Sequence, residues 1–177
     1  RFLFPEVRDT SMTRRKLLVS FFGATPLLYP CYWEPRWLDV TRRQARLDQP
    51  TGGPPARLLH LSDLHASVFV PLSMIHRAIS AGLAQKPDFI CLTGDFITMR
   101  QDFDPGAYAD ALRRLSQAAP TFAVLGNHDG GSWTRRHFGY PDHRLVERIL
   151  EDAGIELLHN RSTKVEVRGA AIQLAGV

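Results

Sequence analysis

Phe122-Ala123-Val124-Leu125-Gly126-Asn127-His128-Asp129 is the last of three stretches in which a short apolar run ends in a polar cluster. The earlier two join Leu58–Leu61 to Asp63-Leu64-His65, and Phe89–Leu92 to Thr93-Gly94-Asp95. Each run is apolar and edged by turn formers, which is typical of a buried strand. Helix-sized segments separate the runs, so the pattern predicts parallel strands of one α/β sheet. The polar clusters would then meet at the carboxyl edge of the sheet, where ligands usually bind.

The polar clusters supply carboxylate, imidazole and amide oxygen, which suit one or two divalent metal ions. A single cluster would carry little weight, because Asp-x-His arises by chance and Gly-Asp is a common turn. Gly126 and Asn127 also have a structural interpretation as a left-handed turn after the strand. Three such clusters at equivalent strand ends favour a metal site. No Ser or Cys has an obvious activating partner, so the sequence predicts no side-chain nucleophile.

The clusters resemble the first three signature blocks of the calcineurin-like metallophosphoesterases: Asp-x-His, Gly-Asp and Gly-Asn-His-Asp/Glu. The resemblance covers roughly residues 57–177 and implies an α/β fold, a β-sandwich flanked by helices that holds two divalent metal ions. Mn is the favoured metal, with Zn, Fe and Mg as alternatives. Such ions, about 3.5–4 Å apart, activate water for in-line attack on a phosphoryl group.

The same resemblance implies a role for each matching residue. Asp63 and His65 would bind the first metal, and Asp95 would bridge both. Asn127 would bind the second metal through its amide oxygen. His128 would contact the phosphate and help the leaving group depart, as a catalytic hydrogen-bond or proton donor.

Two later blocks of the family, an isolated His and a Gly-His-x-His, are not recognised before Val177. His137 and His143 follow the third block too soon, and His159, beside Asn160, fits a turn better. We therefore interpret the domain as C-terminally incomplete and expect these residues alone to hydrolyse a generic phosphodiester poorly. Apolar strand faces are also expected to lie uncovered, around Val165, Val167, Ile172 and Leu174.

Residues 1–33 resemble an export signal: a basic segment, residues 13–18 with paired arginines, overlaps an uncharged stretch at 17–33. The arginines resemble a twin-arginine signal. We predict a retained membrane anchor, with a cleaved signal and a buried helix hairpin as alternatives. Residues 34–56 would be a linker to the catalytic domain at 57–177. The predicted location is the bacterial inner membrane, or beyond it after twin-arginine export.

Composition fits a soluble enzyme domain, with 44% hydrophobic and 23% charged residues. The net charge of +4 belongs to residues 1–60, which have ten Lys/Arg and five Asp/Glu, against twelve and thirteen in residues 61–177. No nucleic-acid partner is therefore expected. Cys31 and Cys91 are too few and too far apart to indicate a disulfide framework.

The substrate is predicted from two features. Arg100, Arg135 and Arg136 follow the second and third blocks and are predicted to bind a second phosphate or a diphosphate, a solvated basic loop being the alternative. Trp133 and Phe138 would stack on a base or an acyl chain, or only pin the loop. An anchor beside a phosphoesterase site indicates a lipid-linked phosphate, and membrane-attached proteins with this pattern include UDP-2,3-diacylglucosamine pyrophosphatases of lipid A biosynthesis. A general phosphodiesterase or phosphomonoesterase and an inactive, metal-poor scaffold are the alternatives.

Apolar periodicity and turn residues predict the remaining elements. A long active-site loop would reach Tyr140, and the closing strands would form an antiparallel meander. The expected elements are helices at 71–84, 106–118 and 141–153, and strands at 57–62, 88–93, 121–125, 155–158, 163–167 and 170–177.

Overall fold

The computed structural model describes residues 37–45, 54–98, 103–137 and 139–177. The predicted anchor, residues 34–36 and 46–53 of the predicted linker, Arg100 and Phe138 lie outside the described residues. The chain divides into two units, Arg1–Asp39 and Val40–Val177, and all described helices and strands belong to the second. In the part of the chain that the structure describes, no helix has the length and apolar character needed to cross a bilayer.

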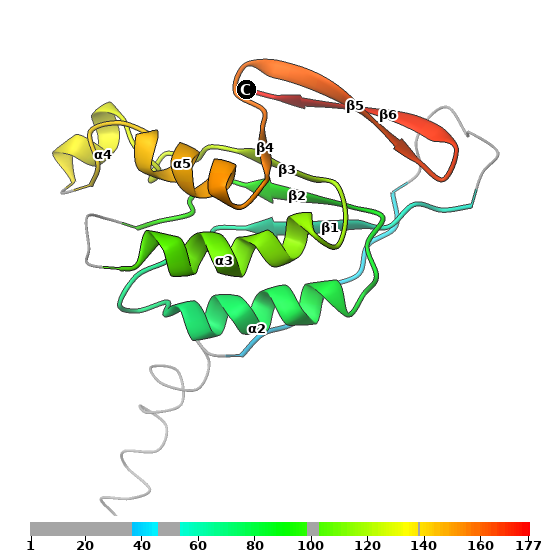
Figure 1. The fold of residues 1–177 in the computed structure, drawn as a ribbon, viewed down its shortest axis with the longest axis horizontal. Coiled ribbons are helices and arrows are strands. Elements are labelled where there is room, and N and C mark those ends of the chain that lie inside the picture. The colour runs from blue at the N-terminus through cyan, green and yellow to red at the C-terminus, as the bar shows by residue number, and fades with distance from the viewer. Residues whose placement is uncertain (1–36, 46–53, 99–102, 138) are drawn as a thin grey trace, which may run out of the picture. The chain divides into compact units, whose positions relative to one another are not determined.

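Four parallel strands form one sheet in the order in which they occur along the chain (Figure 1). Their bounds are β1 Leu58–Ser62, β2 Phe89–Thr93, β3 Thr121–Val124 and β4 Glu156–Leu157. The first three strands confirm the predicted parallel sheet, with Leu59 opposite Ile90 and Ile90 opposite Thr121. The polar clusters therefore leave the sheet at one edge.

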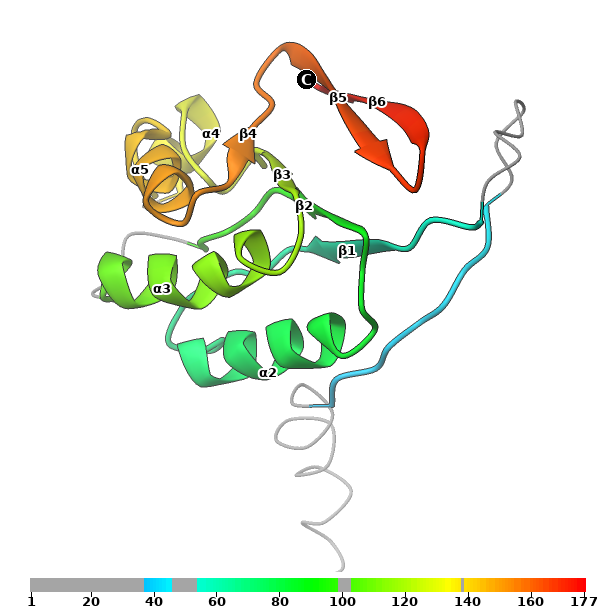
Figure 2. The same ribbon diagram turned by 45° about the vertical axis from the view of Figure 1, so that its right-hand side comes forward.

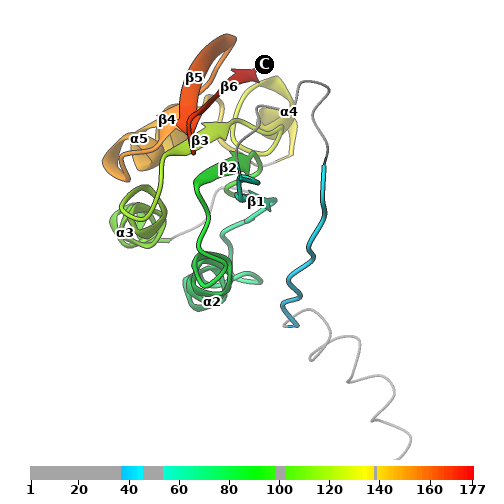
Figure 3. The ribbon, with the colours of Figure 1, turned by 90° about the vertical axis from the view of Figure 1, so that its right-hand side faces the viewer.

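Three helices cover one face of this sheet (Figure 3): α2 Leu72–Leu83, α3 Pro105–Ser116 and α5 Arg144–Asp152. Their apolar stripes pack on the alternate strand residues that point the same way, such as Ile90 and Leu92. Asp104 caps α3 by accepting hydrogen bonds from the main-chain N–H groups of Gly106 and Ala107. The helices confirm the α/β prediction.

The opposite face of the sheet is covered by an antiparallel hairpin of β5 Arg161–Val167 and β6 Ala170–Gly176 (Figure 2). Val165 and Val167, 7% and 4% exposed, pack against Phe89 and Phe122. Ile172 and Leu174 are partly buried in the same cluster. The expectation that these apolar faces lie uncovered was wrong, because the first sheet itself supplies an apolar surface for the hairpin.

Three further predictions were wrong in detail. The closing strands are not one meander, since β4 pairs in parallel with β3 and only β5 and β6 are antiparallel. The loop after the third block contains a short helix, α4 Ser132–Arg136. Helix α5 begins at Arg144 rather than at residue 141, because the carboxylate of Asp142 accepts a hydrogen bond from the Arg144 N–H and makes a turn.

Strand β1 is less buried than the sequence predicted. It lies at the edge of the sheet with β2 as its neighbour, and the hairpin packs on β2 and β3 instead. Leu58 is 51% exposed as a result, and His60 is also exposed.

At the other end of the strands, the carboxylate of Asp88 joins three parts of the unit. It accepts a hydrogen bond from the Arg57 N–H at 2.7 Å and pairs with Arg168 Nε at 3.0 Å. Arg57 precedes β1, and Arg168 lies in the hairpin turn. The Arg57 N–H, and then the Arg168 guanidinium, hold the pKa of Asp88 below its ordinary value of 3.8.

Candidate metal centre

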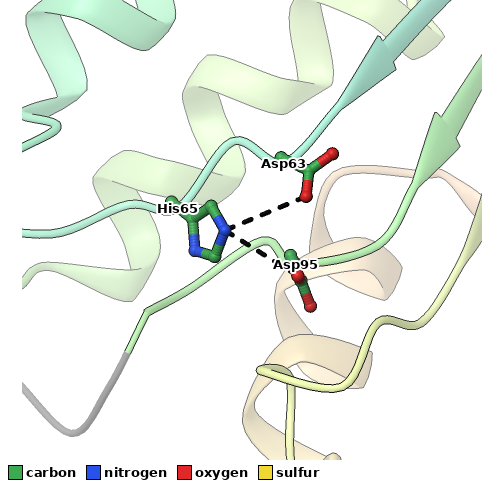
Figure 4. A group of neighbouring side chains, drawn as sticks. All are labelled: Asp63, His65 and Asp95. Carbon is green, nitrogen blue, oxygen red and sulfur yellow. Dashed lines mark ion pairs between the residues drawn. The ribbon is translucent and has the colours of Figure 1, made fainter. Parts of the chain in front are cut away.

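Asp63, His65 and Asp95 meet at the carboxyl edge of the sheet. One ligand atom from each lies within 4.8 Å of the others, and the three side chains point toward one another (Figure 4). His65 Nε2 is 3.9 Å from Asp63 Oδ1 and 3.7 Å from Asp95 Oδ2. Atoms that bind the same ion at about 2.0–2.6 Å are separated by up to about 5 Å. The spacing and the donor types therefore fit a divalent ion.

The outer oxygen of each carboxylate is held by a hydrogen bond. Ser62 Oγ donates to Asp63 Oδ2, and the His128 N–H donates to Asp95 Oδ1 at 2.8 Å. The other oxygen of each group is the one that faces His65. Both carboxylates are thus oriented before any ligand binds.

The backbone at these three residues is in an uncommon conformation. Asp63, His65 and Asp95 have φ values of 54°, 46° and 52°. Positive φ costs free energy for a residue with a side chain, and such residues are concentrated at functional sites. The His65 N–H donates to the Asp95 carbonyl at 2.8 Å and holds the two loops together.

Gly94 and Gly126 allow the second and third clusters to approach closely. A Cβ on Gly94, where φ is +70°, would lie 2.5 Å from the main-chain nitrogen of Gly126. A Cβ on Gly126 would lie 2.2 Å from Asp95 Oδ1. Neither Gly126 nor Asn127 has a positive φ, so their interpretation as a left-handed turn was wrong. The absence of a side chain at Gly126 instead allows the Asp95 carboxylate to lie against its backbone.

Asp129 connects the loops that follow β2 and β3 through buried hydrogen bonds. Its side chain is buried, and Oδ1 accepts hydrogen bonds from the N–H groups of Phe96 and Ile97 at 2.6 and 3.3 Å. Its Oδ2 accepts from the Gly126 N–H at 2.8 Å. Burial is the main cause that raises the pKa of Asp129. The last carboxylate of the third cluster therefore joins two loops and does not face the ligand group.

His128 lies beside the centre, in contact with other rings. Its ring is 4.9 Å from that of His65 and 4.5 Å from that of Trp133, centroid to centroid. Trp133 in turn stacks on His137 at 4.3 Å. These contacts agree with the alternative in which Trp133 pins the loop. The contact of His128 with phosphate stays a prediction.

The other predicted site residues are less closely defined. Asn127 is exposed on the loop after β3, and its role as a ligand of a second metal stays a prediction. Arg135 and Arg136 are exposed on α4, and their contact with a phosphate also stays a prediction.

Sequence reasoning missed the bracing role of Asp129 and the part played by Thr98. The hydroxyl oxygen of Thr98 lies 3.2 Å from His65 Nδ1, and the main-chain carbonyl oxygen of Thr98 lies 3.0 Å from His128 Nδ1. Apart from the bond between Asp129 and Gly126, these contacts have no local signal, because they join groups at least 30 positions apart in the sequence. The position of Asp129 within the third cluster was its one hint.

Residues 56–168, which contain all three clusters, match the family described as calcineurin-like phosphoesterase. The chain belongs to this family. The resemblance inferred from the three clusters is thereby confirmed, and the mixed α/β fold with its parallel sheet is consistent with this phosphoesterase family.

Similar proteins include the Escherichia coli (strain K12) phosphodiesterase YaeI, 37% identical over 148 residues, 84% of this chain and 52% of that protein. The uncharacterized metallophosphoesterase YkoQ of Bacillus subtilis (strain 168) is 31% identical over 145 residues, 78% of this chain and 50% of YkoQ. The UDP-2,3-diacylglucosamine pyrophosphatase LpxG of Chlamydia muridarum is 29% identical over 104 residues, 58% of this chain and 32% of LpxG. The chain spans about half the length of YaeI and YkoQ.

Proposed function

We propose that this calcineurin-like phosphoesterase is a metal-dependent hydrolase of phosphoester or diphosphate bonds, with water as the nucleophile. The convergence of Asp63, His65 and Asp95 carries the proposal. Divalent ions bound there would supply Lewis-acid activation of the water and charge stabilisation for the phosphoryl group. Mn is the favoured metal, with Zn, Fe and Mg as alternatives, since carboxylate ligands suit Mn and Mg and imidazole suits Zn and Fe.

Each side chain has a defined task in this proposal. Asp63 and His65 would hold one ion, Asp95 would be shared between that ion and a second, and Asn127 would bind the second. His128 donates a hydrogen bond or a proton to the oxygen of the leaving group, where negative charge develops. Its place beside His65 supports this role, because a group bound at the centre would lie within reach of the His128 ring.

The favoured substrate is a lipid-linked phosphate, specifically UDP-2,3-diacylglucosamine. The similarity to LpxG supports this choice, and so does the membrane anchor predicted for residues 1–33. Arg135 and Arg136 would contact the second phosphate of the diphosphate. The whole protein would then act in lipid A biosynthesis at the bacterial inner membrane, with twin-arginine export as the alternative location.

A general phosphodiesterase is the second candidate. The similarity to YaeI, which is named a phosphodiesterase, supports it. The two candidates share the metal centre and differ in the diphosphate and the acyl chains of the substrate. An inactive scaffold is the remaining alternative, and it predicts weak metal binding.

Hydrolysis by the purified full-length protein tests the proposal. With Mn²⁺ added, bis-p-nitrophenyl phosphate should be hydrolysed, and a chelator should abolish the reaction. Asp95→Ala should lose activity, whereas Asp110→Ala, on the exposed face of α3, should keep it. Release of UMP from UDP-2,3-diacylglucosamine would support the lipid substrate over the general phosphodiesterase. Absence of both metal binding and hydrolysis in the full-length protein would contradict the proposed function.

A further inference from the structure

Thr98 contacts the rings of both His65 and His128. Its hydroxyl lies 3.2 Å from His65 Nδ1 and 3.3 Å from the His65 carbonyl oxygen. Its own carbonyl oxygen lies 3.0 Å from His128 Nδ1. The segment leading to Thr98 is held in place, since Ile97 forms a parallel bridge with Ala66 and the Ile97 N–H donates to Asp129.

The contact with His128 specifies where that ring carries its hydrogen. A carbonyl oxygen has no proton, so the hydrogen bond requires a hydrogen on His128 Nδ1. In the neutral ring the other nitrogen, Nε2, then has no hydrogen. To donate to the leaving oxygen, the ring must therefore first take up a proton from solvent at Nε2, while Nδ1 keeps its hydrogen toward the Thr98 carbonyl.

The contact with His65 involves a hydroxyl, which both donates and accepts hydrogen bonds. If the Thr98 hydroxyl donates its hydrogen to the His65 carbonyl, a lone pair of the hydroxyl oxygen can accept the hydrogen of His65 Nδ1. The Nε2 atom is then unprotonated, as a metal ligand must be. If the hydroxyl donated to Nδ1 instead, the hydrogen would lie on Nε2, which faces the carboxylates of Asp63 and Asp95. That arrangement would oppose metal binding.

We propose that Thr98 is a positioning residue that fixes the same tautomer in both histidines. Its hydroxyl accepts the hydrogen of His65 Nδ1, and its carbonyl accepts that of His128 Nδ1. His65 Nε2 is then available to bind the metal, and His128 Nε2 is available for proton transfer. This role for Thr98 rests on the proposed function, because the two histidines belong to the proposed metal centre. The proposal goes further in assigning a task to a residue outside the ligand set.

The first test is imidazole ¹⁵N NMR on the metal-free, full-length protein, which reports which ring nitrogen carries the hydrogen. Both His65 and His128 should carry their hydrogen on Nδ1. Thr98→Val keeps the shape and the carbonyl but removes the hydroxyl, so His65 should shift toward hydrogen on Nε2 while His128 stays unchanged. Hydrogen on Nε2 of either ring in the unsubstituted protein would overturn the assignment for that ring.

The second test is calorimetric titration with Mn²⁺. Thr98→Val should weaken binding about 10–100-fold, the usual effect of losing a partner that orients a ligand. Thr98→Ser, which keeps the hydroxyl, should restore most of the affinity, and Thr163→Val on β5 is the matched control. Equal affinities for the Val variant and the unsubstituted protein would overturn the proposal. If the Val variant does not fold, the Ser variant and the NMR spectrum of the unsubstituted protein still decide. If both histidines carry their hydrogen on Nδ1 but the protein hydrolyses no phosphoester, the proposed function is refuted and the role of Thr98 is not.

Discussion

The carboxylate of Asp95 occupies the space that a side chain on Gly126 would need, since a Cβ there would lie 2.2 Å from Oδ1. Gly126→Ala should therefore displace the carboxylate from the His128 N–H and from His65. We expect Mn²⁺ affinity to fall at least about 10-fold, measured by calorimetry. Gly106→Ala, in the first turn of α3, is the matched control. Unchanged affinity in the Gly126 variant would show that the loops adapt without loss.

Asp95 and His128 should respond differently to substitution. In the full-length protein, Asp95→Ala should lose both bound metal and activity, because it removes the bridging charge. His128→Ala should keep the metal and lose about 10²–10⁴-fold in kcat, as expected for a general acid. Metal content by mass spectrometry, together with steady-state kinetics, separates the two outcomes. Equal metal loss in both variants would mean that His128 is misassigned.

Asp129 should be needed for stability. Asp129→Ala leaves three main-chain N–H groups without their acceptor, namely those of Phe96, Ile97 and Gly126. Phe96 and Ile97 are buried and Gly126 is partly buried. Unpaired buried donors cost about 1–3 kcal/mol each, so the variant should lose at least about 2 kcal/mol of unfolding free energy. Urea denaturation followed by circular dichroism measures the loss. A change below about 0.5 kcal/mol would show that water replaces the carboxylate.

Asp88→Asn should lower stability in a way that depends on pH. The pKa of Asp88 is lowered in the folded protein, so its ionised form stabilises the fold above the unfolded pKa of about 3.8. That stabilisation is lost as the pH falls through the lower, folded pKa. We therefore expect the variant to melt about 2–4 °C below the unsubstituted protein at pH 7. The gap should close below pH about 4, and a gap that persists in acid would contradict this.

The sequence was informative where the determinants are local. Apolar runs with turn residues predicted β1 to β3, and periodic stripes such as Ile75 and Ile79 predicted the helices. Partners remote in the sequence were not predictable. Strand β4 is two residues long, and its pairing with β3 is supported by the Leu158 N–H donating to the Ala123 carbonyl. The partners of Thr98 and Asp129 were hidden for the same reason.

The position of β1 has a consequence for how the protein moves. Among the described residues, this edge strand has one strand neighbour, yet Asp63 and His65 follow directly from its end. An ion shared with Asp95 would join β1 to β2 a second time, beyond the hydrogen bonds of the sheet. Local unfolding of β1 would then require release of the metal, and amide hydrogen exchange in β1 should slow when Mn²⁺ is added. Opening of the edge strand and release of the metal would then be one linked equilibrium, which can be followed either by amide exchange in β1 or by metal binding.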